Sequence, residues 1–529
     1  MNPSHLGQLS PWDPELTELA SRRRLAEELG GEAAVAKHRS RGRLTIRERI
    51  QGVVDDGSFV EIGKVAGKGV YERGELKSFI PAPYVMGLAK IGNRPVAIGG
   101  EDFTVRGGSS AGGFRRKGGQ GGFADDLALH YRIPLISLVD GAGGSVTTTS
   151  SRGYPMLPGA TGNTETTVQL LGQVPVVAAV MGTAAGGPAI RAVLAHWSVM
   201  VKDTSVFAAG PVVVKRSLGQ LVSKEELGGS DIAVDAAGTV HDVAPDEATA
   251  FELIRRYLSY MPSNVWEAPP EIPCDDPVTR ADESLAHIVP RNRRQPYDMR
   301  KLLRSVMDQE SIFEIQERHA RSVITSLARL NGKVVGIIAN NPMVNGGAVD
   351  AKAARKQVRF MELCDMFHIP LIFVVDAPGV MVGVEAERAG TLREGARVVI
   401  MRDQLTVPVI TLIVRKCYGM AGASMLDRRG LRLRLAWPSA EWGSLPIEGG
   451  VAAAFRSEIE AAPDPKAKEL EIEAGLRSMS SPFRTAEAFA VEDIIDPRET
   501  RRYLCAFLDV ARTRVRTELG PKLSPRVAV

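Results

Sequence analysis

The chain has 529 residues, 44% of them hydrophobic and 24% charged, which predicts a globular protein with more than one domain. Its net charge of +4 comes from 66 basic and 62 acidic residues, a balance that does not favour nucleic-acid binding. Four widely spaced cysteines, without a CxxC pair or an N-terminal apolar run, predict a cytoplasmic protein without disulfides. No run approaches 18 apolar residues, so we expect no membrane segment.

The first predicted elements are helical. Residues 12–50 are charged and carry apolar positions at helical spacing, which predicts a helix or helical hairpin leading into the first domain. From about Phe79 short β-rich runs follow: YVMGLAKI, RPVAIGGEDF, PLISLVD, VPVVAAVMG and SVMVKD. They alternate with the helical stretches GFADDLALHYR and DEATAFELIRRYLSYM. This alternation predicts an α/β fold with strands covered on both faces.

A proline-rich, acidic segment, MPSNVWEAPPEIPCDDP, follows Tyr260 and is the strongest domain boundary in the chain. We therefore expect two domains, residues 1–270 and 271–529.

The second predicted domain repeats the motifs of the first. GLAKIGNRPVAIGGEDFTVRGGS is echoed by SLARLNGKVVGIIANNPMVNGGA, and IPLISLVDGAGG by IPLIFVVDAPGV. A third pair is GQVPVVAAVMGTAAGGPA and LTVPVITLIVRKCYGMAGAS. The spacing is nearly constant, at 239 residues from Gly107 to Gly346 and 236 from Asp140 to Asp376. The order and spacing predict two copies of one fold.

Each copy contains a strand followed by a turn of small residues, MGTAAGGPAIRAVLA in the first and VRKCYGMAGASMLD in the second. Small residues at a strand-to-helix turn leave backbone N–H groups uncovered, and such a turn suits an anion or a developing oxyanion. The alternative is that these turns only pack helix on sheet. Two of them at equivalent positions favour a reaction in which two partners each develop negative charge on an oxygen.

Four segments carry a resemblance to a known family: KHRSRGRLTIRERI, VMVKDTSVFAAGPVVVKRSLGQLVSKEELGG, VDAPGVMVGVEAERAGTLREGARV and VEDIIDPRETR. They resemble the carboxyltransferase (β) subunits of biotin-dependent acyl-CoA carboxylases of the propionyl-CoA and acetyl-CoA type. The resemblance covers roughly residues 15–515. It implies two tandem crotonase-like domains of β-β-α units, related by duplication and assembled as a hexamer. Active sites then form where the N-domain of one subunit meets the C-domain of another.

The resemblance also implies a division of chemistry between the two copies. Gly186 and Gly187 are expected to face the acyl-CoA thioester, and Met420 and Ala421 are expected to face biotin. The carboxyl group passes from carboxybiotin to the α-carbon of the acyl-CoA. The chain lacks an AMKM-like biotin attachment sequence and an ATP-grasp pattern. We therefore expect biotin to arrive on a partner, the biotin carboxylase and biotin carboxyl carrier (α) subunit.

Further substrate contacts are expected in three loops. Arg115, Arg116 and Lys117 form either an electropositive loop for CoA phosphates or a solvated surface loop. Ala423 stands where short-chain family members have an Asp, which predicts a roomier, more apolar pocket and a substrate other than simply acetyl- or propionyl-CoA. The full set of expected substrate contacts is Gly107, Gly108, Ser109, Arg115, Arg116, Lys117, Gly143, Gly144 and Ala423.

Two alternatives to an acyl-CoA carboxylase subunit remain open. One is a crotonase-fold decarboxylase or transcarboxylase acting on malonyl-type CoA esters. The other is a non-catalytic scaffold subunit, because DGAGG and YGMAGAS depart from the family pattern. The eight histidines show no metal-ligand spacing, so we expect no bound metal. Asp140 and Asp376 are predicted to anchor the turns that follow them by Asx-type hydrogen bonds.

Overall fold

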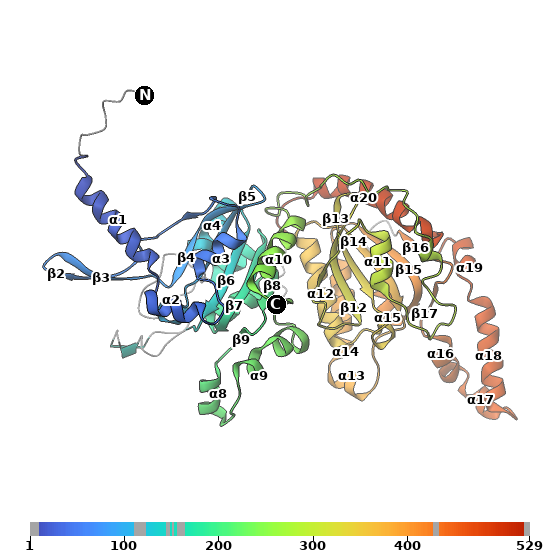
Figure 1. Ribbon diagram of the computed structural model, residues 1–529. Coiled ribbons are helices and arrows are strands. Elements are labelled where there is room, and N and C mark those ends of the chain that lie inside the picture. The colour runs from blue at the N-terminus through green and yellow to red at the C-terminus, as the bar shows by residue number, and fades with distance from the viewer. Residues whose placement is uncertain are drawn as a thin grey trace. The chain divides into compact units, whose positions relative to one another are not determined.

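A computed structural model describes residues 10–109, 123–143, 149–150, 153–155, 164–426 and 433–522. The chain divides into two compact units, Met1–Arg256 and Tyr257–Val529, and in Figure 1 each contains a sheet with helices against it. The boundary between the two units lies before the proline-rich segment, because the residues that follow Tyr257 form hydrogen bonds with the second unit. Arg329 donates hydrogen bonds to the carbonyl oxygens of Ser259 and Pro270.

Among the described residues of the first unit, eight strands form one sheet in the order β1-β4-β5-β6-β7-β8-β10, with β9 paired to β7. The strands from β5 onward pair in parallel, whereas β4 is antiparallel to β5 and β1 to β4. The strands are β1 (Val60–Glu61), β4 (Tyr84–Ile91), β5 (Arg94–Glu101), β6 (Leu135–Gly141), β7 (Val176–Ala185), β8 (Trp197–Val201), β9 (Ser205–Phe207) and β10 (Asp242–Ala244), and a separate hairpin contains β2 (Gly67–Glu72) and β3 (Glu75–Pro81).

The helices of the first unit include the predicted N-terminal helical region, which is divided into α1, α2 and α3. A capping box between Thr45 and Glu48 starts α3, because each residue bonds the backbone N–H of the other. The helices are α1 (Asp13–Glu27), α2 (Glu32–Arg39), α3 (Ile46–Val53), α4 (Phe123–Tyr131), α6 (Thr164–Leu171), α7 (Gly187–Leu194), α8 (Pro211–Leu218), α9 (Lys224–Gly228) and α10 (Glu247–Tyr260), with short 3-10 and π turns at Arg106–Gly108 and Asp231–Ala236. The last residues of α10, from Tyr257, already belong to the second unit.

The second unit repeats the sheet of the first. Eight strands of its described residues pair in the order β11-β12-β13-β14-β15-β16-β18, with β17 paired to β15. Each pairing has the same direction as its counterpart in the first unit. The predicted duplication is confirmed. The strands are β11 (Phe313–Ile315), β12 (Val323–Leu330), β13 (Lys333–Asn340), β14 (Leu371–Ala377), β15 (Val409–Tyr418), β16 (Arg434–Ala436), β17 (Glu441–Gly443) and β18 (Asp493–Ile494).

Helices cover both faces of the second sheet. They are α11 (Met299–Val306), α12 (Ala351–Met366), α13 (Val384–Arg388), α14 (Thr391–Gln404), α15 (Gly419–Ala423), α16 (Ile447–Ala454), α17 (Arg456–Ala461), α18 (Pro465–Met479), α19 (Pro482–Glu487) and α20 (Thr500–Thr517), with 3-10 turns at Glu283–Ala286, Asn345–Gly347 and Pro497–Glu499. Across the described ranges, every helix is too short or too polar to span a lipid bilayer. All four cysteines are free thiols.

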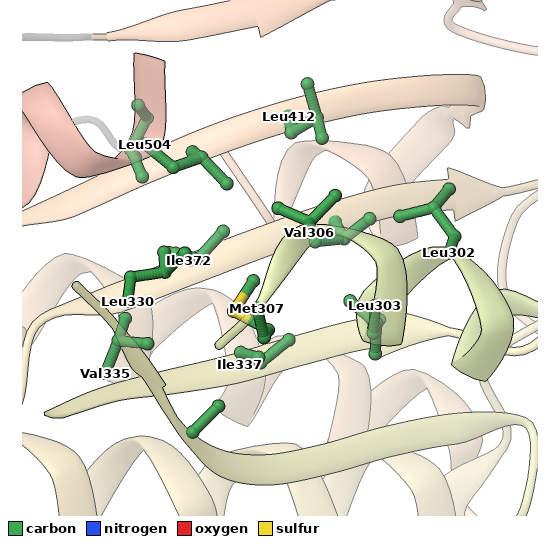
Figure 2. Close-up of a cluster of buried hydrophobic side chains, with 14 of the residues drawn as sticks. Leu302, Leu303, Val306, Met307, Leu330, Val335, Ile337, Ile372, Leu412 and Leu504 are labelled. Atoms are coloured by element: carbon green, nitrogen blue, oxygen red, sulfur yellow. The ribbon is translucent and has the colours of Figure 1, made fainter. Parts of the chain in front are cut away.

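A hydrophobic core of the second unit lies between its sheet and helices α11 and α20. Figure 2 shows Leu303 and Val306 of α11 beside Ile337 and Ile372 of the strands. Leu504 of α20 belongs to the same cluster, and each of these side chains is almost completely buried. This packing fixes the sheet whose strand ends carry the candidate site.

The central strands β7 and β15 each change partner along their length. Residues 177–180 of β7 pair with β8, and residues 183–185 pair with β9. In β15, residues 411–413 pair with β16 and residues 416–418 with β17. On the opposite side of each central strand, the pairing of β6 with β7 changes register between Val139 and Gly141, and the pairing of β14 with β15 changes register between Val375 and Ala377. The carboxyl ends of β7 and β15 therefore fork, because each strand leaves one neighbour and pairs with another. Ligands bind at this edge in parallel sheets.

Candidate active site

The aspartate at the end of β6 joins two strands through buried bonds. Asp140 is fully buried, and its Oδ1 accepts the backbone N–H of Thr183 on β7 at 3.2 Å. Its Oδ2 accepts a hydrogen bond from Arg49 at 3.0 Å, and Arg49 also binds the Glu247 carboxylate at 2.7 Å. This network connects α3, β6, β7 and α10 directly behind the strand ends.

Asp376 does the same in the second unit. Its Oδ1 accepts the backbone N–H of Lys416 on β15 at 3.1 Å, and its Oδ2 accepts a hydrogen bond from Arg415 at 3.0 Å. The Arg415 guanidinium also lies 4.8 Å from the centre of the Tyr297 ring. These bonds cross to the neighbouring strand, whereas the sequence predicted bonds to the turn that follows each aspartate. The repeated aspartate is a structural anchor of each copy.

The first candidate turn joins β7 to α7. Gly186 has φ 60° and ψ −123°, a backbone conformation that glycine adopts without strain. Helix α7 begins at Gly187, so the N–H groups of its first turn have no acceptor within the helix. A Cβ on Gly186 would lie 3.9 Å from Gly143, and a Cβ on Gly187 would meet nothing within 4 Å. The turn thus presents uncovered backbone donors in open space.

Two glycine-rich loops lie beside this turn. Ser109 Oγ donates to the carbonyl oxygen of Gly143 at 2.6 Å, and the Ala142 N–H donates to that of Gly107 at 2.9 Å. A Cβ on Gly143 would come within 2.5 Å of the Ala185 carbonyl oxygen, so only glycine allows this approach. The loops after β5 and β6 therefore pack against the end of β7.

Glu101 at the end of β5 completes the first cluster. Its carboxylate accepts the backbone N–H of Asp140 at 3.3 Å and pairs with Arg191 of α7. A Cβ on Gly108 would lie 2.6 Å from the Asp140 carbonyl oxygen, which explains a glycine there. The first unit brings together Gly107, Gly108, Ser109, Gly143, Gly186 and Gly187, whereas Arg115, Arg116, Lys117 and Gly144 lie outside the described residues.

The second candidate turn joins β15 to α15. Gly419 has φ 56°, and α15 begins there, so the N–H groups of Gly419, Met420 and Ala421 have no acceptor within the helix. The Met420 side chain packs against α14, because a Cβ on Gly395 would lie 2.7 Å from its Cε. By the pairing of β7 with β9 and of β15 with β17, Gly419 and Met420 correspond to Gly186 and Gly187, and Ala421 lies one residue further into α15.

Ala423 lies one residue after the glycine at 422 and lines a cavity of about 220 Å³. The walls of this cavity are largely apolar and include Cys417, Leu426 and Trp442. The Ala423 carbonyl oxygen accepts a hydrogen bond from Arg402 of α14, which fixes the end of α15. A small side chain at 423 keeps this cavity open.

Charged side chains hold Tyr418, the residue before the second turn. Arg293 donates to the Tyr418 hydroxyl at 3.3 Å and pairs with Glu441 at 2.7 Å. Burial of the Tyr418 phenol, helped by the negative charge of Glu441, raises its pKa to about 12. Tyr418 is therefore neutral at physiological pH, and it acts here by packing and hydrogen bonding.

Each unit has a lysine near the end of its central strand, although the two lysines, Lys224 and Lys416, do not occupy equivalent positions. Thr183 and Lys416 each donate a backbone N–H to the aspartate of the neighbouring strand, so they are equivalent. Burial lowers the pKa of Lys416. In the first unit the ammonium comes from α9, where Lys224 donates to the Thr183 hydroxyl at 2.9 Å. In the sequence, the equivalence of Thr183 and Lys416 is indicated by their offset of 233 residues, which is close to the offsets of the other repeats.

The comparisons with known proteins cover nearly the whole chain. Residues 37–526 match the carboxyl transferase domain family. The chain is 35% identical to a propionyl-CoA carboxylase carboxyltransferase subunit of Haloferax mediterranei, covering 96% of this chain and 98% of that protein. It is 34% identical to the methylmalonyl-CoA carboxyltransferase 12S subunit of Propionibacterium freudenreichii subsp. shermanii, covering 98% of each.

Solved structures give the same result. The hexameric transcarboxylase 12S, determined with methylmalonyl-CoA bound, superposes with a TM-score of 0.86 at 32% identity, covering 98% of this chain and 99% of that chain. A single-chain, multi-domain long-chain acyl-CoA carboxylase matches with a TM-score of 0.76 at 28% identity, covering 94% of this chain and 49% of that chain. The predicted pair of crotonase-like domains is confirmed. The chain belongs to the carboxyl transferase family.

Proposed function

We propose that this chain is the carboxyltransferase subunit of a biotin-dependent acyl-CoA carboxylase. In this role it transfers a carboxyl group from carboxybiotin, carried by a partner protein, to the α-carbon of an acyl-CoA. The observation that carries the proposal is the matched pair of turns, one at Gly186–Gly187 and one at Gly419–Ala421, each at the start of a helix that follows a forked strand. Family membership supports the same reaction.

In the proposed reaction the first turn acts on the acyl-CoA. The N–H groups of Gly186 and Gly187 bind the thioester oxygen, which gains negative charge when the α-proton leaves. Preorganised, uncharged donors stabilise such an oxyanion without the need for a counter-ion. The loops that carry Gly107, Gly108, Ser109 and Gly143 pack against this turn, and we propose that they bind the CoA arm, together with Gly144 and the segment 115–117.

The second turn acts on biotin. Its N–H groups are uncharged donors, so they fit an acceptor such as the urea oxygen of biotin. Biotin supplies the carboxyl group and, through its ureido nitrogen, a base for the α-proton. The N–H groups of Met420 and Ala421 bind the urea oxygen and stabilise the charge that forms on it. No side chain of this chain is required as the base.

Substitution of Gly186 by Val tests the first turn. A β-branched side chain at φ 60° blocks the approach of the thioester to the N–H groups. We expect kcat to fall by about 10²–10³, the usual effect of removing an oxyanion donor. Carboxylation of an acyl-CoA, measured with the partner subunit, gives this value.

Gly92 provides a matched control for this substitution. It has φ 57°, a Cβ there would meet nothing within 4 Å, and it lies in the β4–β5 turn at the opposite edge of the sheet. Gly92→Val imposes a similar backbone strain but should leave kcat unchanged. Equal activity of the Gly186→Val and wild-type enzymes would contradict the proposed role of the first turn.

A transcarboxylase is the second candidate, favoured by the 34% identity to the methylmalonyl-CoA carboxyltransferase 12S subunit. The two activities differ in the source of the carboxyl group. A carboxylase complex forms product only with ATP and bicarbonate, whereas a transcarboxylase forms it from a carboxylated CoA ester without them. Product analysis under both conditions distinguishes them.

We also propose an assembly and a location for the chain. The hexameric assembly of transcarboxylase 12S supports a homohexamer, in which the first turn of one copy meets the second turn of another. The biotin carboxylase and biotin carboxyl carrier (α) subunit is the proposed partner. Four widely separated cysteines without disulfides support a cytoplasmic location.

A further inference from the structure

A lysine lies at the end of β15, close to the second turn. Lys416 is half-buried and lies three residues before Gly419, roughly 10 Å away along the strand. Its backbone N–H donates to Asp376 Oδ1 of β14 at 3.1 Å. In the pairing of β15 with β17, Lys416 is the direct partner of Glu441, about 4.8 Å away across the sheet. The strands on both sides therefore fix the position of this lysine.

The carboxylates next to Lys416 are each bound by an arginine. Asp376 Oδ2 accepts a hydrogen bond from Arg415 at 3.0 Å. Glu441 accepts hydrogen bonds from Arg293, one of them at 2.7 Å. Within the residues that the structure describes, the Lys416 ammonium forms no hydrogen bond or salt bridge. The strand end therefore carries a half-buried cation whose neighbouring carboxylates are already occupied.

Arg293 reaches this region from the segment before α11. Its guanidinium binds Glu441 of β17, Glu448 of α16 at 3.2 Å and the Tyr418 hydroxyl at 3.3 Å. One guanidinium thus joins three elements around the second turn. Arg477 of α18 adds a second cation to Glu448 at 2.9 Å. Two carboxylates beside the turn would repel an anionic ligand, and the two arginines balance their charge.

We propose that Lys416 binds the carboxylate of carboxybiotin and that Arg293 is the positioning residue that keeps this lysine free. The inference rests on the proposed function, which assigns the second turn to biotin. The N–H groups of the turn are uncharged donors that suit the urea oxygen, whereas the carboxylate of carboxybiotin carries a full negative charge. An ammonium binds such a group as a point charge, through hydrogen bonds that are stronger than those between neutral groups. Without Arg293, Glu441 would be the partner of Lys416 on the neighbouring strand.

Steady-state kinetics of the full chain with the biotinylated carrier subunit test the lysine. Lys416→Met removes the charge and should raise KM for the carboxylated carrier by about tenfold, the usual effect of losing one charge-assisted hydrogen bond. We expect kcat to change little, because the contact is made to the bound carboxylate before transfer begins. The inhibition constant of the same carrier with uncarboxylated biotin should be unchanged, since biotin itself lacks the carboxylate.

A pair of substitutions tests the positioning role of Arg293. Arg293→Met releases Glu441, which then pairs with Lys416, so KM for the carboxylated carrier should again rise by about tenfold. Adding Glu441→Gln removes the competing charge and should restore most of the affinity. A guanidinium that only held the strand end together would not be replaced by this second substitution. Failure of the rescue would overturn the positioning role.

Two further variants serve as controls. Lys416→Arg keeps the positive charge and should retain most of the affinity for the carboxylated carrier. Lys301 is an exposed lysine of α11 in the same unit, and Lys301→Met should leave KM unchanged. Calorimetry with CoA should give the wild-type affinity for every variant, because the proposed acyl-CoA turn lies in the other unit.

The outcomes separate this inference from the function on which it rests. If the wild type carboxylates an acyl-CoA but Lys416→Met has the wild-type KM for the carboxylated carrier, the carboxylate contact is wrong and the proposed function stands. If Lys416→Met weakens the carboxylated and uncarboxylated carriers equally, the lysine contacts another part of the carrier, and the inference is again wrong. A loss of affinity confined to the carboxylated acyl-CoA product would place the contact on the other substrate and overturn it as well. A wild type that transfers no carboxyl group would overturn both.

Discussion

At the scale of single residues, Arg49 is the buried charge on which the first site depends. Only 1% of its side chain is exposed, and it binds Asp140, Glu247 and the carbonyl oxygen of Met181. Its partner Asp140 also holds Thr183 on β7. Removing the guanidinium would leave two buried carboxylates without a counter-charge, which usually costs about 3–5 kcal/mol.

Arg49→Met should therefore lower the free energy of unfolding by about 3–5 kcal/mol. Urea denaturation followed by circular dichroism measures this change. Arg39→Met is the matched control, because Arg39 forms an exposed pair with Glu48 that should contribute less than about 1 kcal/mol. Similar losses for the two variants would show that the buried network does not carry the stability assigned to it.

Ala423 is the residue at which we expect substrate choice to be set. Asp at this position would introduce a charge into the largely apolar cavity beside Cys417 and Trp442. Ala423→Asp should lower kcat/KM for butyryl- and longer acyl-CoAs, relative to propionyl-CoA, by about tenfold. Ala423→Asn separates size from charge. A wild type with a strong preference for acetyl-CoA would contradict this account of the cavity.

At the scale of elements, the two copies differ in how closely a helix approaches the sheet. Ala97 of β5 pairs with Leu135, and Gly336 of β13 pairs with Leu371, so the two residues occupy equivalent positions in the two sheets. Residue 97 is an alanine, so the first sheet has room for a Cβ there. At Gly336 a Cβ would lie 2.5 Å from Cys364 Sγ on α12. Helix α12 therefore requires glycine beneath it.

Gly336→Ala should consequently destabilise the protein by about 1–3 kcal/mol through overpacking. A second substitution, Cys364→Ala, removes the sulfur and should restore part of the loss when the two are combined. Thermal unfolding of the two single variants and the double variant gives the coupling. Additive effects would indicate that the contact between β13 and α12 is not the cause.

At the scale of the whole molecule, local patterns predicted much of the fold and of the turns. The repeated strands and glycine turns lie in continuous stretches, so one sequence with two matching copies was enough to place Gly186 and Met420. Several long-range contacts were not predicted. Arg49 binds Glu247 across 198 positions of sequence, and Lys224 reaches Thr183 from a separate helix. Such pairings depend on tertiary packing, and periodicity does not encode them.

The proposed assembly has a direct consequence for the mass of the particle. Multi-angle light scattering should give a particle of six chains of 56.9 kDa each. Because the proposed site needs turns from two copies, dilution to smaller species should abolish carboxylation while leaving helix content intact. A fully active monomer would contradict this arrangement.

The forked ends of β7 and β15 show how the two halves can carry the different ligands that we propose for them. The fork separates the parallel strands of the sheet from the long excursions that run from Phe207 to Asp242 and from Gly443 to Asp493. Insertions and substitutions can accumulate in those excursions without altering the hydrogen bonds that define either turn. Under the proposed function, each half can therefore be adapted to its own ligand by changing only its appended helices, while the backbone of its turn stays the same.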